Sequence, residues 1–293
     1  MAVAAQQTED RARLGIMMML GAWFMFALVD TGAKWVVVAG VPAIQAAFFR
    51  YAGHFAISIA AIGRGGMSLS RFETPYFWPL VFRSALLISA TCLNFYVLKV
   101  LPLTVTSAIM FSSPIIVSIL SWPLLGERIG PWRTAAVLVG FAGVLIVIRP
   151  FGEAFHWAML LVVYNATALA LYSILTRKLA GTVATETMQF YMGLLGTGVL
   201  LPFALWSWVW PENPTQWVVL LSLGLFGWAG HQLLTGAHRF ATSGTLMPYT
   251  YSFLLYLTFT SYLVFGHIPD VWTMIGAAVI IGSGLVIWKR ENR

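Results

Sequence analysis

Residues 124–132 read LLGERIGPW, and residues 264–272 read VFGHIPDVW. The two stretches share a glycine and a tryptophan at the same offset, and each stands between two long apolar runs. Five predicted membrane spans separate one copy from the other, and an odd number of crossings reverses the direction of the chain. The sequence therefore predicts an inverted repeat, whose two halves enter the membrane from opposite sides.

The chain is too apolar to fold as a soluble domain. Of its 293 residues, 59% are hydrophobic and 9% are charged, whereas soluble domains carry about 25% charged residues. The net charge of +7 is dispersed over the ends of apolar runs, which excludes a nucleic-acid partner. The single cysteine, Cys92, excludes an intrachain disulfide and a CxxC-type metal site. These features predict an integral membrane protein whose surroundings are the lipid bilayer.

Ten stretches are long enough to cross a bilayer core of about 30 Å, which takes roughly 20 apolar residues in a helix. The fourth contains Pro114 and Pro123, which predict a kink. The predicted fold class is an all-α integral membrane protein, with ten transmembrane helices as two inverted five-helix repeats, residues 1–150 and 151–293. The predicted spans are residues 14–35, 43–62, 76–97, 103–125, 132–149, 155–176, 187–209, 215–237, 244–265 and 270–288.

The basic residues predict the orientation of these spans. With the N-terminus in the cytoplasm, Lys34, Lys99 and Arg149 are the only Lys and Arg residues at outer ends, against thirteen at cytoplasmic ends. Basic residues concentrate on the cytoplasmic side of membrane proteins. Both termini are therefore predicted to be cytoplasmic.

Several residues of these spans form a known pattern. An Arg lies in the second span (FFRY, Arg50) and another early in the third (FRS, Arg83), and a serine-containing run from Pro102 to Pro114 precedes the LLGERIG corner. In these features the chain resembles the EamA-type drug/metabolite transporter superfamily. Its aromatic-rich spans are most similar to bacterial aromatic and amino-acid exporters. The second corner departs from the family pattern, with His267 where Glu is common.

The resemblance implies a fold in which spans one, three, four, six, eight and nine enclose a central cavity, while spans five and ten support it from outside. It implies export of small metabolites, amino acids with aromatic ones favoured, by alternating access across the bacterial inner (plasma) membrane, without a cofactor. The residues themselves permit the supporting role. Gly140, Gly143 and Gly276 would let spans five and ten approach closely.

Polar and aromatic residues inside the spans are the candidates for the cavity wall, because lipid cannot satisfy polar groups. Aromatic rings can stack on a substrate ring, while Asn94, Asn165 and Gln232 can bind an ammonium or a carboxylate. Breaks at Pro114 and Pro248 would leave backbone groups available for the charged ends. The predicted substrate-binding residues are Trp23, Phe26, Asn94, Ser112, Ser113, Tyr164, Asn165, Tyr172, Trp228, His231, Gln232, Tyr249 and Ser252.

The charged residues inside the spans need partners, because an uncompensated buried charge is expensive. Asp30 is the nearest acidic candidate for Arg50 in depth, although Lys34 is an alternative partner for Asp30. A structural clamp or outer gate and a role of Arg50 in binding a carboxylate both stay open. Glu127 is expected to cap the fifth span, with inner-gate closure as the alternative. The predicted gating or structural residues are Asp30, Arg50, Pro114, Glu127 and Pro248.

Other functions are less well supported by the residues. A proton-coupled efflux pump for cationic drugs generally requires a carboxylate deep in the membrane, and Asp30 lies off-centre. An enzyme is not predicted, since the HExxH and GxSxG motifs are absent from the sequence. No metal site is predicted either. The expected partners are a small-molecule substrate and the bilayer; small-residue spans permit a dimer but pack equally well within one chain, and a monomer is favoured.

Overall fold

The computed structural model describes residues 2–63, 73–125, 131–149, 152–179, 182–241 and 246–291, and these ranges fold as helices joined by short connections. This confirms the predicted all-α class. The helices are α1 (Ala2–Val38), α2 (Ala43–Gly63), α3 (Phe77–Val97), α4 (Leu103–Met110), α5 (Ser113–Leu125), α6 (Pro131–Ile148), α7 (Ala158–Leu179), α8 (Thr185–Trp206), α9 (Pro214–Phe240), the 3₁₀ helix η2 (Met247–Tyr251), α11 (Ser252–Phe265) and α12 (Val271–Glu291).

The helices follow the predicted spans closely, because a chain in lipid must satisfy its backbone within each segment and can do so as a helix. Within the described residues, five helices are long and apolar enough to cross a membrane, and three shorter apolar helices accompany them. The predicted fourth span consists of two segments, α4 and α5, and the predicted ninth consists of η2 and α11. The kink predicted in the fourth span therefore lies at Phe111 and Ser112, just before Pro114.

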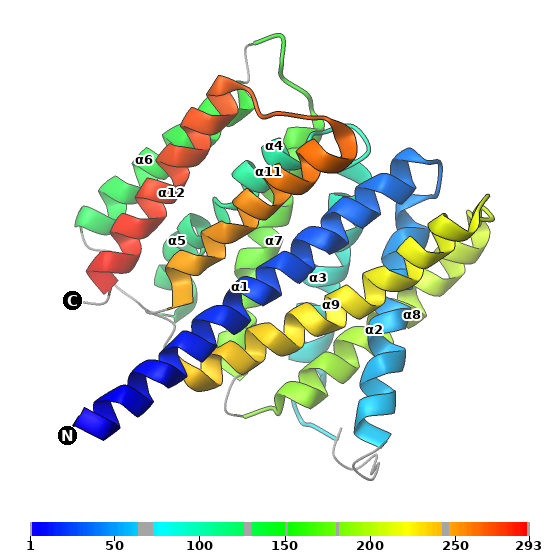
Figure 1. The fold of residues 1–293 in the computed structure, drawn as a ribbon, viewed down its shortest axis with the longest axis horizontal. Coiled ribbons are helices and arrows are strands. Elements are labelled where there is room, and N and C mark those ends of the chain that lie inside the picture. Colours follow the sequence, from blue (N-terminus) through cyan, green and yellow to red (C-terminus); the bar gives the residue numbers. More distant parts are fainter. Residues whose placement is uncertain are drawn as a thin grey trace.

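Helices from the two halves of the chain pack against each other in pairs (Figure 1). The long helices α1 and α9 run side by side, and α3 packs along α7. The second helix, α2, lies on both α8 and α9, while α11 contacts α1 and α4. At the far edge of the bundle, α6 and α12 form a separate pair (Figure 1). Each of these contacts joins a helix of the first half of the chain to a helix of the second half.

Glycines allow the closest of these approaches. A Cβ atom built on Gly224 of α9 would lie 2.6 Å from the Cα of Gly53 on α2, so the two backbones touch. A Cβ atom on Gly276 of α12 would lie 2.8 Å from the carbonyl oxygen of Gly143 on α6. Small residues at such crossings let membrane helices pack tightly. The predicted packing role of Gly143 and Gly276 is confirmed.

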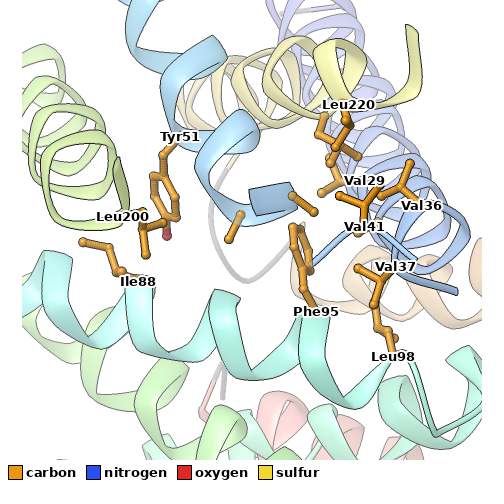
Figure 2. Close-up of a cluster of buried hydrophobic side chains, with 14 of the residues drawn as sticks. Val29, Val36, Val37, Val41, Tyr51, Ile88, Phe95, Leu98, Leu200 and Leu220 are labelled. Carbon is orange, nitrogen blue, oxygen red and sulfur yellow. The ribbon is translucent and has the colours of Figure 1, made fainter. Parts of the chain in front are cut away.

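The largest cluster of buried apolar side chains joins α1, α2, α3, α8 and α9 (Figure 2). Tyr51 of α2 and Phe95 of α3 are each 1% exposed in this cluster. Arg50 precedes Tyr51, and Asn94 precedes Phe95. Because successive residues of a helix point about 100° apart, burial of the two aromatic rings fixes the directions of Arg50 and Asn94.

Among the described residues, the end of the bundle predicted to face outward is formed by residues 39–42, 98–102, 152–157, 207–213 and 266–270. The second of the two repeated stretches lies here, and Gly266 ends α11 in the left-handed region with φ +66°. Such a conformation favours glycine, which explains why glycine stands at this corner. Asp270 then accepts a hydrogen bond from the backbone N–H of Thr273 at 2.8 Å and caps α12. Glu127 and the corner around it lie outside the described residues.

Candidate functional site

A cavity of about 130 Å³ opens between α1, α2, α3, α4 and α7. Its wall contains an acid, a base, two asparagines and one threonine among apolar side chains. Such a combination is typical of small-molecule sites, in which a few polar groups orient the ligand within an apolar pocket. The lining residues are Asp30, Arg50, Leu87, Ala90, Thr91, Asn94, Phe95, Met110, Asn165 and Leu169.

Asp30 of α1 faces α3 across the cavity. The side-chain amide of Asn94 donates to its Oδ1 at 3.2 Å. Lys34, the alternative partner considered for Asp30, turns elsewhere: its Nζ donates to the carbonyl oxygen of Leu101 at 2.6 Å and lies 5.3 Å from the ring centre of Phe265. Lys34 therefore links α1 to the segment after α3 near the predicted outer end. The Asp30 carboxylate lines the cavity instead of pairing with Lys34.

Arg50 of α2 approaches α3 one helical turn away from Asn94. Its Nη1 donates to Thr91 Oγ1 at 2.7 Å, and the Tyr51 hydroxyl lies 3.0 Å from the same Thr91 oxygen. The Nε of Arg50 is buried and has no hydrogen-bond partner. Within the described part of the chain, no ion pair of 4.0 Å or less joins Arg50 to Asp30. The two opposite charges thus line the same cavity while each is held by α3.

Asn165 of α7 completes the polar part of the wall. Its side chain is 1% exposed, and neither its Nδ2 nor its Oδ1 has a hydrogen-bond partner. Buried polar groups in proteins are almost always paired, so an unpaired amide at a cavity is a sign of a missing ligand group. The cavity therefore offers a cationic donor at Arg50, an anionic acceptor at Asp30 and an amide that can do both.

A run of aromatic and imidazole rings lies beside this cavity. Trp23 and Phe26 of α1 are 5.7 Å apart between ring centres, and Phe26 is 5.0 Å from His231 of α9. His231 in turn lies 5.7 Å from His54 of α2, one turn beyond Arg50. The Nε2 atoms of both histidines are buried without a partner. Trp23, Phe26 and His231 thus form one contiguous structure next to the cavity, outside its lining.

A second cavity, of about 390 Å³, lies between α1, η2, α11 and α12. Tyr249 and Ser252 line it, together with Leu20, Tyr251 and other apolar residues. The Ser252 hydroxyl donates to the carbonyl oxygen of Tyr249 at 2.7 Å and so stays within its own helical turn. These two predicted site residues are therefore close together, but they belong to a different and more apolar cavity than Asp30 and Arg50.

Tyr164 and Gln232 lie away from both cavities. Tyr164 is 43% exposed, and its hydroxyl lies 3.0 Å from Ser89 Oγ; Gln232 is exposed on α9. Neither side chain belongs to the lining of the two cavities. Their role in substrate binding stays a prediction.

Tyr172 belongs to a clamp around Arg83 that the sequence did not reveal. The guanidinium donates to the Tyr172 hydroxyl at 2.5 Å and to Thr176 Oγ1 at 2.7 Å, and its centre lies 4.2 Å from the Tyr172 ring. Arg83 is 4% exposed. These contacts tie α3 to α7, so the residue pattern that marked Arg83 as a family feature corresponds to a structural role here.

Most of the remaining predicted site residues lie at or beside the two helix breaks, and Trp228 lies within α9. Ser112 and Ser113 are buried where α4 gives way to α5, and Ser112 Oγ has no partner. Two amides at the break are bonded within the chain: Ser112 N–H donates to the Ile109 carbonyl at 2.9 Å, and Ile116 N–H to the Ser112 carbonyl at 2.9 Å. Pro114 lies in the first turn of α5 and Pro248 in η2. Trp228 is half-buried on α9, with its Nε1 unpartnered.

The sequence of this helical bundle matches a known protein family. The model of the EamA-like transporter family matches the chain twice, over residues 13–149 and 156–289. The chain belongs to the EamA-like transporter family. This confirms the resemblance found in the sequence, and it makes the protein a multi-pass membrane protein of a family of transporters.

Relatives of the EamA-like chain carry named transport functions. A riboflavin transporter of Rhizobium johnstonii is 29% identical over 97% of this chain and 94% of its own length. An S-adenosylmethionine uptake transporter of Rickettsia bellii is 27% identical over 92% of this chain and 94% of its own. The pseudopaline exporter of Pseudomonas aeruginosa is 25% identical over 97% and 99%, respectively. All three carry small metabolites, and none of their names refers to an enzyme or to amino-acid export.

A solved structure supports the same fold. A protein of known crystal structure superposes on the chain with a TM-score of 0.66 and 22% identity, and the match covers 97% of this chain and 99% of the other. At this identity the likeness concerns the arrangement of helices alone.

Proposed function

We propose that this EamA-like protein carries a small polar metabolite across the bacterial inner membrane by alternating access around the Asp30–Arg50 cavity. The observation that carries the proposal is that two opposite charges line one cavity without pairing with each other. Charges inside a membrane protein are expensive and mark substrate pathways when they face a cavity. A substrate that pairs with both Asp30 and Arg50 would be held in this cavity.

The first candidate substrate is an amino acid or a metabolite with an amino-acid end. Its carboxylate would meet the Arg50 guanidinium, whose Nε is unpartnered, and its ammonium would meet Asp30. The S-adenosylmethionine carried by one relative has such an end. An aromatic preference draws less support from the wall of the cavity, where Phe95 is the aromatic member of the lining.

The second candidate is a flavin, favoured by the relatives named riboflavin transporters, one of which is 29% identical over nearly the whole chain. A flavin ring has polar edges that can pair with Asn94, Asn165 and Arg50, and an apolar face for Leu87 and Leu169. Efflux of cationic drugs is disfavoured, because the relatives reported above are named as transporters of metabolites.

We further propose that the ten spans form two inverted five-helix repeats. The two matches of the family model divide the chain between residues 149 and 156, next to the boundary predicted at residue 150. The contacts support the same symmetry: if α1, α2 and α3 correspond to α7, α8 and α9, the pair α1 and α9 corresponds to α7 and α3, and both pairs are in contact. The second segments of the two broken spans, α5 and α11, begin at Ser113 and Ser252, 139 residues apart, close to the offset of 140 between the two repeated stretches. Cytoplasmic termini remain the prediction of the basic residues.

Transport by the purified protein in liposomes would test the function. The panel contains labelled riboflavin, S-adenosylmethionine, phenylalanine, tryptophan, threonine and a cationic drug, each measured in both directions, with and without a pH gradient. We expect saturable flux of at least one flavin, adenosyl compound or amino acid, and a loss of that flux in the Arg50→Gln protein. Flux of the drug alone, or flux unchanged by Arg50→Gln, would contradict the proposal.

A further inference from the structure

Asn165 is a buried polar residue of the cavity wall, and the roles proposed for Asp30 and Arg50 do not explain why it is there. Its carboxamide is almost completely excluded from solvent at 1% exposure, and both polar atoms of that amide lack partners. Leu169, one turn later on α7, lines the same cavity. On the other faces of α7, the Tyr164 hydroxyl has Ser89 within 3.0 Å and the Tyr172 hydroxyl accepts from Arg83. The unsatisfied amide is therefore confined to the face that meets the cavity.

An amide side chain in this state has a definite chemical complement. Its N–H₂ donates and its carbonyl oxygen accepts, and the two atoms lie side by side in one plane. A partner that satisfies both must present an acceptor and a donor next to each other. Asn and Gln make this bidentate pairing with the edge of adenine in nucleic acids, and the carbonyl and N–H of a ring imide offer the same arrangement.

We infer that Asn165 is a specificity-determining residue, which recognises a substrate bearing a nucleobase-like heterocycle with adjacent donor and acceptor atoms. The inference rests on the proposed transport function and narrows its substrate class. An amino-acid end alone does not serve, because its ammonium and carboxylate are drawn to Asp30 and Arg50, the charges of the same wall. A plain phenyl side chain would leave the amide unpaired.

A structural role of Asn165 predicts different behaviour from a recognition role. If the amide stabilised the fold, replacing it with an apolar side chain would lower stability. If the amide serves to bind a ligand, the protein without ligand is destabilised by the desolvation of two unpaired polar atoms. Replacing the amide with an apolar side chain of similar size would then be neutral or stabilising. The variant Asn165→Leu therefore separates the two roles, because it changes recognition and stability in opposite directions.

The experiment uses two matched pairs of labelled probes with the full-length protein in liposomes. The first pair is a flavin with a free ring imide and the same flavin methylated at the imide nitrogen. The second pair is adenosine and its derivative dimethylated at the exocyclic amine. For at least one pair, we expect the wild type to transport the unmodified probe better by about 5- to 150-fold in kcat/KM, the range that corresponds to one bidentate pairing.

Two variants test whether Asn165 causes this preference for the unmodified probe. In Asn165→Leu the ratio should fall to near one, while the Tm of the purified protein stays equal to or above that of the wild type. Ser173→Ala, on an exposed face of the same helix where the hydroxyl bonds to the Leu169 carbonyl, should keep the full ratio.

Three results of these assays with the paired probes would overturn the inference, in addition to the two substrate results given last. The first is equal transport of the modified and unmodified probes in both pairs by the wild type. The second is a preserved ratio in Asn165→Leu. The third is a fall in the Tm of that variant together with the loss of the ratio, which would mark a structural role of the amide. Transport of amino acids without either heterocycle overturns the role of Asn165 and leaves the proposed transport function intact, whereas no flux of any panel member overturns both.

Discussion

Asp30 and Arg50 face one cavity from different helices, yet each is bonded to α3, through Asn94 and Thr91, and they do not bond to each other. Thr91 and Asn94 are one helical turn apart on α3. The third helix thus holds the two charges apart, and a substrate with both charges can bridge them.

Neutralising either charge should weaken transport of a zwitterionic substrate. Hydrogen bonds to charged groups contribute about 1.5–3 kcal/mol, so Asp30→Asn and Arg50→Gln should each lower kcat/KM by about 10- to 100-fold. Flux of the labelled substrate in liposomes measures the effect. If the residues formed only a structural pair, the double variant would recover most of the activity, and that recovery would contradict the role proposed for them.

Thr91 is predicted to position Arg50. In Thr91→Val the shape of the side chain is nearly kept, but the Arg50 Nη1 and the Tyr51 hydroxyl lose their shared partner. We expect KM to rise by about 5-fold or more, which corresponds to the loss of a hydrogen bond of about 1 kcal/mol that orients Arg50. Thr91→Ser restores the hydroxyl and should behave as the wild type. Equal KM values for the valine and serine variants would show that the hydroxyl does not hold Arg50.

The contact between α2 and α9 should not tolerate a side chain. In Gly224→Ala the new Cβ would lie 2.6 Å from Gly53 Cα, and forced overpacking costs about 1–3 kcal/mol. The Tm of the purified variant should therefore fall. Gly198→Ala is the matched control, because nothing lies within 4 Å of its Cβ position, and its Tm should be unchanged or higher. Similar Tm values for both variants would exclude a tight crossing at Gly224.

The ion pair between Arg149 and Asp270, at 2.6 Å, predicts a pH-dependent contribution to stability. Partial burial tends to raise the pKa of Asp270, but the Thr273 N–H and the Arg149 guanidinium outweigh it and hold the pKa below the usual 3.8. A lowered folded-state pKa contributes stability that is present above about 3.8 and is lost as the pH falls below it.

Comparison with Asp270→Asn isolates this contribution, since asparagine can still cap α12. The side chains of Arg149 and Asp270 are 27% and 48% exposed, so solvent screening limits the difference to less than about 1 kcal/mol. Thermal unfolding at pH 7 should show the wild type slightly more stable, with the gap closing as the pH falls below about 3.8. A gap that widens in acid would give the opposite sign and refute the ion pair as its cause.

The helices were predictable because the membrane leaves an apolar chain few alternatives. The break at Phe111 and Ser112 followed from Pro114, and the relation in depth between Asp30 and Arg50 followed from helix length. The exposure of Tyr164 and Gln232 was not predictable, since residue type alone does not tell which face of a helix packs against its neighbours. The Arg83 clamp was missed because its partners, Tyr172 and Thr176, lie on a helix distant in the sequence.

The pairing of α6 with α12 bears on how the cavity can open. These helices are joined by the glycine contact at Gly143 and Gly276, by the Ser283 hydroxyl that donates to the Ala136 carbonyl, and by the ion pair at one end. The cavity lies among other helices. We therefore expect α6 and α12 to stay together as one unit when the helices that line the cavity move against each other.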